Sequence, residues 1–165
     1  MADVKASYPA ASDVTITLAS LASDTNLLAG RESTAVDNSS NLYLDYLISG
    51  KITTGTSPTA ASIQVWTVGS WDGTTWPDVF DGTSSAETIT SADIKNALCK
   101  SVAILPTNNT SDRTYSFTGV SMKTVFGGVL PSQYVLFVVH NTGVALNGTA
   151  GNHELRYQGV YPQVQ

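Results

Sequence analysis

Residues 127–146 read GGVLPSQYVLFVVHNTGVAL, an apolar segment set between turn residues. Tyr134 to Val139 form an unbroken run of apolar residues, most of them aromatic or β-branched, and Pro131 and Asn141-Thr142-Gly143 close it on either side. A short apolar run bounded by turn residues is typical of a strand that is buried on both faces. We therefore expect Tyr134–Val139 to be a central strand of a β-sheet.

The segments around this strand alternate apolar and polar residues, as half-buried strands do. The clearest cases are residues 14–18, 42–54, 62–68 and 154–161, and weaker ones are residues 26–29, 101–105 and 113–118. Residues 120–126 fit either a strand or a helical turn. Because only residues 55–61, with the chain break at Gly55–Thr59, separate them, segments 42–54 and 62–68 are expected to pair as an antiparallel hairpin. The pattern indicates about eight strands.

One segment has the period of a helix. Ser91 is a suitable N-cap, and Ile94, Ala97 and Leu98 fall on one helical face between Ser91 and Lys100. Asp93 near the start and Lys100 near the end both suit the helix dipole. The segment is short, so we expect it to bridge strands.

Together these elements predict an all-β protein: a two-sheet antiparallel β-sandwich of jelly-roll type with one short helix. An immunoglobulin-like sandwich is the alternative, although the chain lacks the Cys–Trp–Cys spacing of that fold. Residues 1–12 have no periodicity and are expected to form an extended N-terminal arm; a frayed terminus is the alternative. Residues 13–165 are expected to form the sandwich domain.

Composition excludes several classes of function. The chain has 165 residues and a net charge of −5, and its eight basic residues are scattered, which argues against a nucleic-acid partner. It has no apolar run long enough to span a membrane and does not begin with a pattern typical of a signal peptide. The lone Cys99 is expected to be a small buried hydrophobic residue.

Residues 71–82, WDGTTWPDVFDG, are unusual in composition. The Asp72-Gly73 pair predicts a tight turn that brings Trp71 and Trp76 together, where they could cover the end of the core or stack on a sugar ring. The carboxylates of Asp72, Asp78 and Asp81 in the same segment could also bind Ca²⁺, but these aspartates lack a recognised ligand spacing. Sugar binding by Trp71 and Trp76 is the alternative function that we consider.

We find no residues arranged for catalysis. No nucleophile elbow is present, and Glu32, Glu87 and Glu154 stand apart in the sequence rather than as a catalytic pair. His140 and His153, with Glu154, could hold a metal only if the fold brought them together. We therefore predict a protein that is not an enzyme, with no cofactor and no metal.

The segment from Leu130-Pro131 through the apolar strand to Asn141-Thr142-Gly143 and Leu146 resembles the C-terminal half of small virion proteins of tailed bacteriophages. It is similar to the jelly-roll decoration, or cement, proteins of phage heads. The resemblance covers about the last third of the chain.

This resemblance implies a structural protein on the capsid surface, made in the host cytoplasm. Its implied partner is the major capsid protein, and it would bridge capsid subunits as a small homo-oligomer, a trimer or, next, a dimer. A tail or host-contact component is the nearest variant. In either case Val4, Tyr8 and Pro9 in the arm are the candidate contacts with a neighbouring subunit or the capsid.

Overall fold

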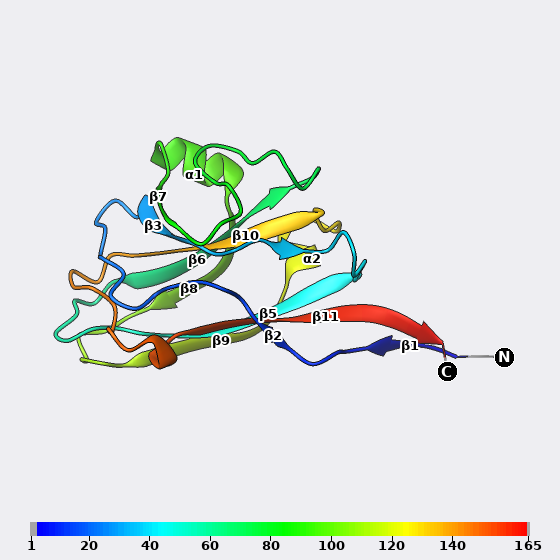
Figure 1. Ribbon diagram of the computed structural model, residues 1–165. Helices are drawn as coiled ribbons and strands as arrows, with labels where there is room; N and C mark the ends of the chain where they lie inside the picture. Colours follow the sequence, from blue (N-terminus) through cyan, green and yellow to red (C-terminus); the bar gives the residue numbers. More distant parts are fainter. Residues whose placement is uncertain (1–2, 165) are drawn as a thin grey trace.

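The computed structural model describes residues 3–164, which form two antiparallel sheets packed as a sandwich (Figure 1). Residues 1 and 2 of the predicted arm and residue 165 of the predicted domain lie outside the described residues. The five-stranded sheet has the order β1 (Val4–Ser7), β11 (Glu154–Val164), β5 (Asp45–Thr53) and β9 (Thr114–Ser121), with β2 (Ser12–Asp13) also beside β11. The six-stranded sheet has the order β7 (Ala86–Thr88), β3 (Ala29–Glu32), β10 (Gln133–His140), β6 (Ser62–Ser70) and β8 (Lys100–Pro106), with β4 (Val36–Asp37) also beside β10. The predicted all-β sandwich is confirmed.

Eight of the strands described between residues 3 and 164 have four or more residues, in agreement with the predicted number. Numbered one to eight along the chain, these strands lie in the order 1-8-3-6 in one sheet and 2-7-4-5 in the other. Neighbours in each sheet are thus mostly distant in sequence.

Strand β10 is central, as predicted. It pairs with β6 along its whole length and with β3 and β4 on its other side. Tyr134, Leu136 and Val138 face the core between the sheets, where the Tyr134 ring meets the ring of Tyr46 from β5 at 5.6 Å. Its alternate residues belong to a second apolar cluster on the outer face of the six-stranded sheet. The strand is therefore buried on both faces.

The second cluster is covered by the segment that follows β6. Phe137 of β10 packs edge to face against Phe80 of this segment at 5.4 Å, and Ile89 and Cys99 join them. The segment contains α1 (Ala92–Leu98), whose N-cap Ser91 accepts a hydrogen bond from the backbone N–H of Ile94. The predicted helix and its cap are confirmed, and Cys99 is buried as expected.

The buried face of α1 differs from the predicted one. Ala97 is exposed, whereas Lys95 is only 5% exposed. The ammonium of Lys95 donates to the carbonyl of Leu27 at 2.6 Å and to Gln64 Oε1 at 3.3 Å, and it lies 4.7 Å from the centre of the Trp66 ring. A cation can occupy this site because acceptors and an aromatic face replace its water.

The predicted hairpin between residues 42–54 and 62–68 is wrong. Strand β5 pairs with β11 and β9, while β6 pairs with β10 and β8 in the other sheet, so the connection between them crosses the sandwich. The first of these strands also begins later than predicted. Leu42 has a φ of 51°, in the left-handed region, and the strand begins at Asp45.

Residues 14–18 were predicted as a strand, but the structure has none there. The alternation of burial is right, because Val14 and Leu18 are buried. The backbone, however, makes only isolated contacts, such as Val14 N–H to Leu155 O at 2.8 Å and Thr34 N–H to Thr15 O at 2.9 Å. Further along, residues 120–126 contain both predicted forms: β9 ends at Ser121 and α2 (Met122–Val125) follows, while a 3-10 turn, η1 (Ala150–Asn152), precedes β11.

Candidate functional site

The N-terminal arm is not a free tail. Strand β1 pairs with the end of β11, from Val4 opposite Val164 to Ser7 opposite Tyr161. Strand β5 leaves β11 at the Asp45–Val160 pair, so β1 and the end of β11 continue as a two-stranded ribbon, which projects from the body of the sandwich in Figure 1. We call residues 3–8 and 161–164 the terminal ribbon.

The terminal ribbon exposes the candidate contact residues unequally. Val4 and its neighbour Val164 are each 67% exposed, and Tyr8 is 54% exposed. Pro9 is half-buried, and its carbonyl accepts a hydrogen bond from Gln158 Nε2 at 2.8 Å. Val4 and Tyr8 are therefore accessible to a partner, whereas Pro9 anchors the ribbon to the sandwich.

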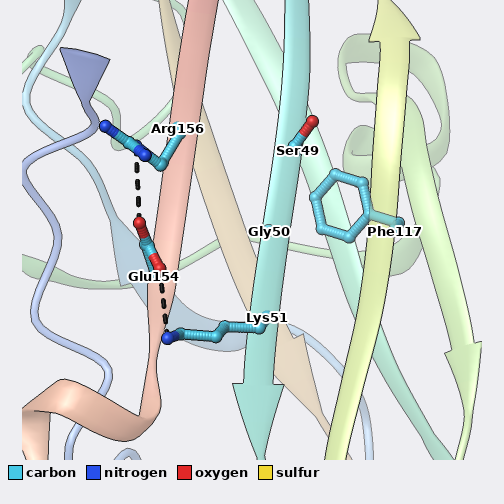
Figure 2. A pocket seen from close by; sticks show the side chains of 6 residues that line it. All are labelled: Ser49, Gly50, Lys51, Phe117, Glu154 and Arg156. Atoms are coloured by element: carbon cyan, nitrogen blue, oxygen red, sulfur yellow. Dashed lines mark ion pairs between the residues drawn. The ribbon is translucent and has the colours of Figure 1, made fainter. Parts of the chain in front are cut away.

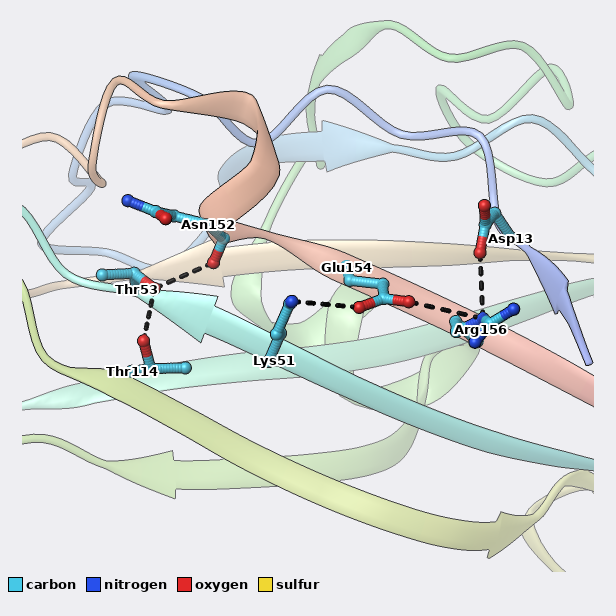
Figure 3. Close-up of polar contacts among 7 residues, drawn as sticks. All are labelled: Asp13, Lys51, Thr53, Thr114, Asn152, Glu154 and Arg156. Carbon is cyan, nitrogen blue, oxygen red and sulfur yellow. Dashed lines mark hydrogen bonds and ion pairs between the residues drawn. The ribbon is translucent and has the colours of Figure 1, made fainter.

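The outer face of the five-stranded sheet carries a row of charges near the start of β11 (Figure 3). Glu154 lies between Lys51 at 3.1 Å and Arg156 at 3.4 Å, and Arg156 also meets Asp13 at 2.9 Å. At one end of this row, Thr53 Oγ1 contacts Thr114 Oγ1 and the carbonyl of Asn152, each at 2.8 Å. The sequence did not reveal this row because its members come from strands that are far apart in the chain.

A shallow hollow of about 280 Å³ lies along this row. Figure 2 shows Lys51, Glu154 and Arg156 on one side and the ring of Phe117 on the other, with Ser49 and Gly50 between them. The side chains of Lys51, Glu154 and Arg156 are 37–46% exposed, and ion pairs at such exposure contribute little to stability. The positive and negative side chains of the row neutralise one another, so this face is polar but carries little local net charge.

Trp71 and Trp76 line one hollow of about 530 Å³, together with Phe126 and Lys100. They differ in burial, however. Trp71 is 64% exposed, whereas Trp76 is half-buried and packs on Gly82 and the second apolar cluster. Trp76 covers the end of that cluster, and Trp71 is the ring available to a ligand.

The three aspartates of this segment have separate hydrogen-bond partners. Asp72 accepts hydrogen bonds from the Thr75 hydroxyl at 2.6 Å and from the Thr74 and Thr75 N–H groups, and these bonds lower the pKa of Asp72. Asp78 accepts from the hydroxyl and N–H of Thr90, and Asp81 from those of Thr83. Among residues 3–164, no three metal-ligating side chains gather at one point.

The two histidines and Glu154 do not form one site either. His140 is buried, with Nδ1 3.0 Å from the Thr142 hydroxyl and Nε2 3.0 Å from the carbonyl of Leu21, and its burial lowers its pKa. His153 Nε2 lies 2.8 Å from the carbonyl of Asn147, and Glu154 is paired with Lys51 and Arg156. Each side chain thus has a local structural partner.

Glu32, one of the three glutamates that stand apart in the sequence, is a buried titratable residue. It is 0% exposed, and Oε1 accepts hydrogen bonds from the N–H groups of Gly82 at 2.8 Å and Asp81 at 3.3 Å. Oε2 has no hydrogen-bond partner in the described part of the chain, and burial raises the pKa of Glu32 to about 7. Glu32 therefore fastens the covering segment to β3. Burial also raises the pKa of Cys99 to about 11, far from that of a reactive thiol.

No family model, curated protein or solved structure matches this chain. In the described residues, no helix is long and apolar enough to cross a membrane. The class that the fold defines is an all-β, two-sheet antiparallel sandwich, and its most exposed apolar residues include Val4, Val164 and Trp71.

Proposed function

We propose that this protein is a non-enzymatic structural protein of a tailed-phage virion, a decoration protein that stabilises the head by bridging capsid subunits. The resemblance of residues 130–146 to such proteins motivates the proposal. A tail or host-contact component is the nearest variant. The partner would be the major capsid protein, and the location would be the capsid surface, after synthesis in the host cytoplasm.

The observation that carries the proposal is the terminal ribbon. It projects from the sandwich and exposes Val4, Tyr8 and Val164, each by more than half of its surface. A two-stranded ribbon is marginally stable in water, so a contact that covers its apolar residues would stabilise it. A projecting contact region on a stable body suits a protein that bridges neighbouring subunits.

We also propose that the sandwich is a jelly roll, the fold of the decoration proteins that the chain resembles. The strand orders 1-8-3-6 and 2-7-4-5 support this assignment, because a jelly roll places its eight strands in two sheets through Greek-key connections. The same arrangement brings the first and last long strands together as the ribbon.

Binding to heads that lack the protein tests the proposal. Purified chain should co-sediment with empty tailed-phage heads, and Tyr8→Ala should weaken binding because it removes exposed apolar area from the ribbon. Trp71→Ala is the matched control, since Trp71 is also exposed, by 64% against 54% for Tyr8, but lies in the turn after β6. Equal binding of wild type and Tyr8→Ala, or no binding to any head, would count against the proposed function.

Carbohydrate binding is the second candidate, and the geometry of Trp71 favours it. The ring stands at the rim of a hollow of about 530 Å³ on a turn that Asp72 holds with four hydrogen bonds. An exposed indole on a fixed turn can stack on the apolar face of a sugar. Glycan binding that is lost in Trp71→Ala and weakened in Trp76→Ala, with both variants folded, would favour this candidate over the first.

A further inference from the structure

We propose that the free edge of β1 pairs antiparallel with β1 of a second copy of this chain, across a two-fold axis, to form a four-stranded ribbon. This inference deepens the proposed function and rests on it only for what the doubled ribbon would contact. The pairing itself follows from the backbone of the terminal ribbon. Pairing across a two-fold axis favours the dimer over the trimer, the two oligomers that the resemblance implies.

The register shows which edge of the ribbon can accept a strand. Leu44 N–H donates to Val160 O, so even-numbered residues of β11 direct their backbone groups away from β1. On that side the ribbon presents Pro162, which has no N–H, and the edge is blocked. Lys5 and Ser7 accordingly bond to β11, opposite Gln163 and Tyr161.

The other edge of the ribbon is open. Since Lys5 and Ser7 use their backbone groups toward β11, Val4 and Ala6 direct theirs outward. No hydrogen bond from these outward groups is found between residues 3 and 164. An open edge of this kind is a template for another extended strand.

A second β1 fits this edge in one favourable register. In an antiparallel pair, residues whose backbone groups point toward the partner strand lie opposite one another. Val4 can therefore lie opposite Val4, Ala6 or Tyr8 of the second copy. Opposite Ala6, it would bring the two Lys5 side chains together, and opposite Val4, it would leave the exposed Tyr8 beyond the overlap of the two strands. Opposite Tyr8, the strands overlap over residues 4–8, with Ala6 at the axis and Lys5 facing Ser7.

This register pairs Val4 of β1 with Tyr8, which directly follows the strand, and both are exposed apolar residues. Val4 at 67% exposure meets Tyr8 at 54% exposure twice, once on each side of the axis. Pairs between aromatic and β-branched residues stabilise neighbouring strands. The chemistry of the edge is therefore complementary to itself, which is what a two-fold contact requires.

The doubled ribbon would have one apolar face. Residues opposite each other in a sheet share a face, so Val4 and Val164 lie on the same side as Ala6 and Pro162. Tyr8 follows on that side by alternation, while Lys5 and Gln163 lie on the other. In a two-fold antiparallel pair the two apolar sides join, which gives a continuous apolar surface for the proposed contact with the capsid.

Sedimentation velocity of the full chain over a range of concentrations tests the pairing, and we expect a dimer. Ala6→Pro removes an outward N–H and should weaken the dimer at least about tenfold, since each interface loses two hydrogen bonds. Val164→Pro is the matched control. Its N–H faces the blocked edge, so the same substitution across the ribbon should leave the dimer unchanged. Both variants should keep the wild-type melting temperature.

The register has its own test at Ser7, which faces Lys5 of the second copy. Ser7→Glu should strengthen the dimer and Ser7→Lys should weaken it, each by about threefold to tenfold at low salt. A monomer at all concentrations, a trimer, or equal effects of Ala6→Pro and Val164→Pro would overturn the edge pairing. A monomer that still co-sediments with heads would overturn the pairing alone and leave the proposed function intact.

Discussion

The two sheets of the sandwich differ in what covers them. The six-stranded sheet is covered on both faces, by the core between the sheets and by the segment that carries α1. The five-stranded sheet is covered on one face only, and its other face carries the charged row from Asp13 to Lys51. The difference is already visible in their long strands. In β10 seven consecutive residues are buried, whereas β11 alternates and then ends in exposed residues.

This contrast assigns different tasks to the two sheets. Burial of apolar area is the main source of folding stability, so the six-stranded sheet with its two clusters is the stable part of the molecule. The five-stranded sheet contributes one face to that core and extends from the body as the terminal ribbon. Substitutions in the two sheets should therefore have unequal effects.

The largest difference is expected between Val138→Asp and Val164→Asp. Val138 is 0% exposed, and an unpaired carboxylate there costs several kcal/mol, a large share of the ~5–15 kcal/mol that stabilises a typical domain. We expect no soluble folded Val138→Asp protein. Val164→Asp, in the ribbon, should melt as the wild type does. A folded Val138→Asp variant with a normal melting curve would contradict the central position of β10.

The next difference compares two phenylalanines. Phe137→Ala opens a cavity in the second cluster and should lower the free energy of unfolding by about 3–5 kcal/mol. Phe117 of β9 is only partly buried, so Phe117→Ala should cost about half as much or less. Urea denaturation of both variants measures the two values. Equal losses would show that the second cluster adds little to stability.

A third comparison uses pH and two glutamates. The pKa of Glu32 is raised from 4.5 to about 7, so between these values the folded state binds a proton that the unfolded state does not. The contribution of Glu32 to the free energy of unfolding is therefore fully present at low pH and is lost as pH rises toward 7. The loss amounts to about 1.4 kcal/mol for each unit by which the pKa is raised. Glu32→Gln should gain stability relative to the wild type over this range, while Glu154→Gln, which loses ion pairs with Lys51 and Arg156, should not.

Histidine titration requires that the Glu32 effect be measured as a difference. The lowered pKa values of His140 and His153 make stability rise as pH rises toward 6.5, which opposes the effect of Glu32. Since both histidines remain in Glu32→Gln, subtracting its unfolding free energy from that of the wild type removes their contribution. A difference that stays constant from pH 4.5 to 7 would mean that Glu32 is not protonated in this range.

The smallest effect is expected in the charged row. Glu154→Gln removes the ion pairs with Lys51 and Arg156, whose side chains are 43% and 46% exposed, and should cost about 0–1 kcal/mol. The loss should shrink further between about 0.05 M and about 1 M salt, because salt screens exposed charges. A loss of several kcal/mol would show that the outer face of the five-stranded sheet is a structural element comparable with the second cluster.

The sequence by itself determined the elements whose signals are local. The apolar run of residues 134–139 identified a strand buried on both faces, and Ser91 with the helical period after it identified α1 and its cap. The expected all-β sandwich followed from the number and spacing of such segments. The apolar residues of the arm and Trp71 could also be named as candidate contact residues, because their residue types alone suggest such a role.

Only the tertiary structure decided which strands pair. A period of two shows that a segment is half-buried but does not identify its partner, since backbone hydrogen bonds are the same for every residue pair. Segments 42–54 and 62–68, expected to form a hairpin, thus lie in different sheets, and residues 4–7 pair with residues 161–164 at the opposite end of the chain. The burial of Lys95 and Glu32 also depended on partners distant in sequence. The terminal ribbon and its open edge exist only because the fold brings the two ends of the chain together.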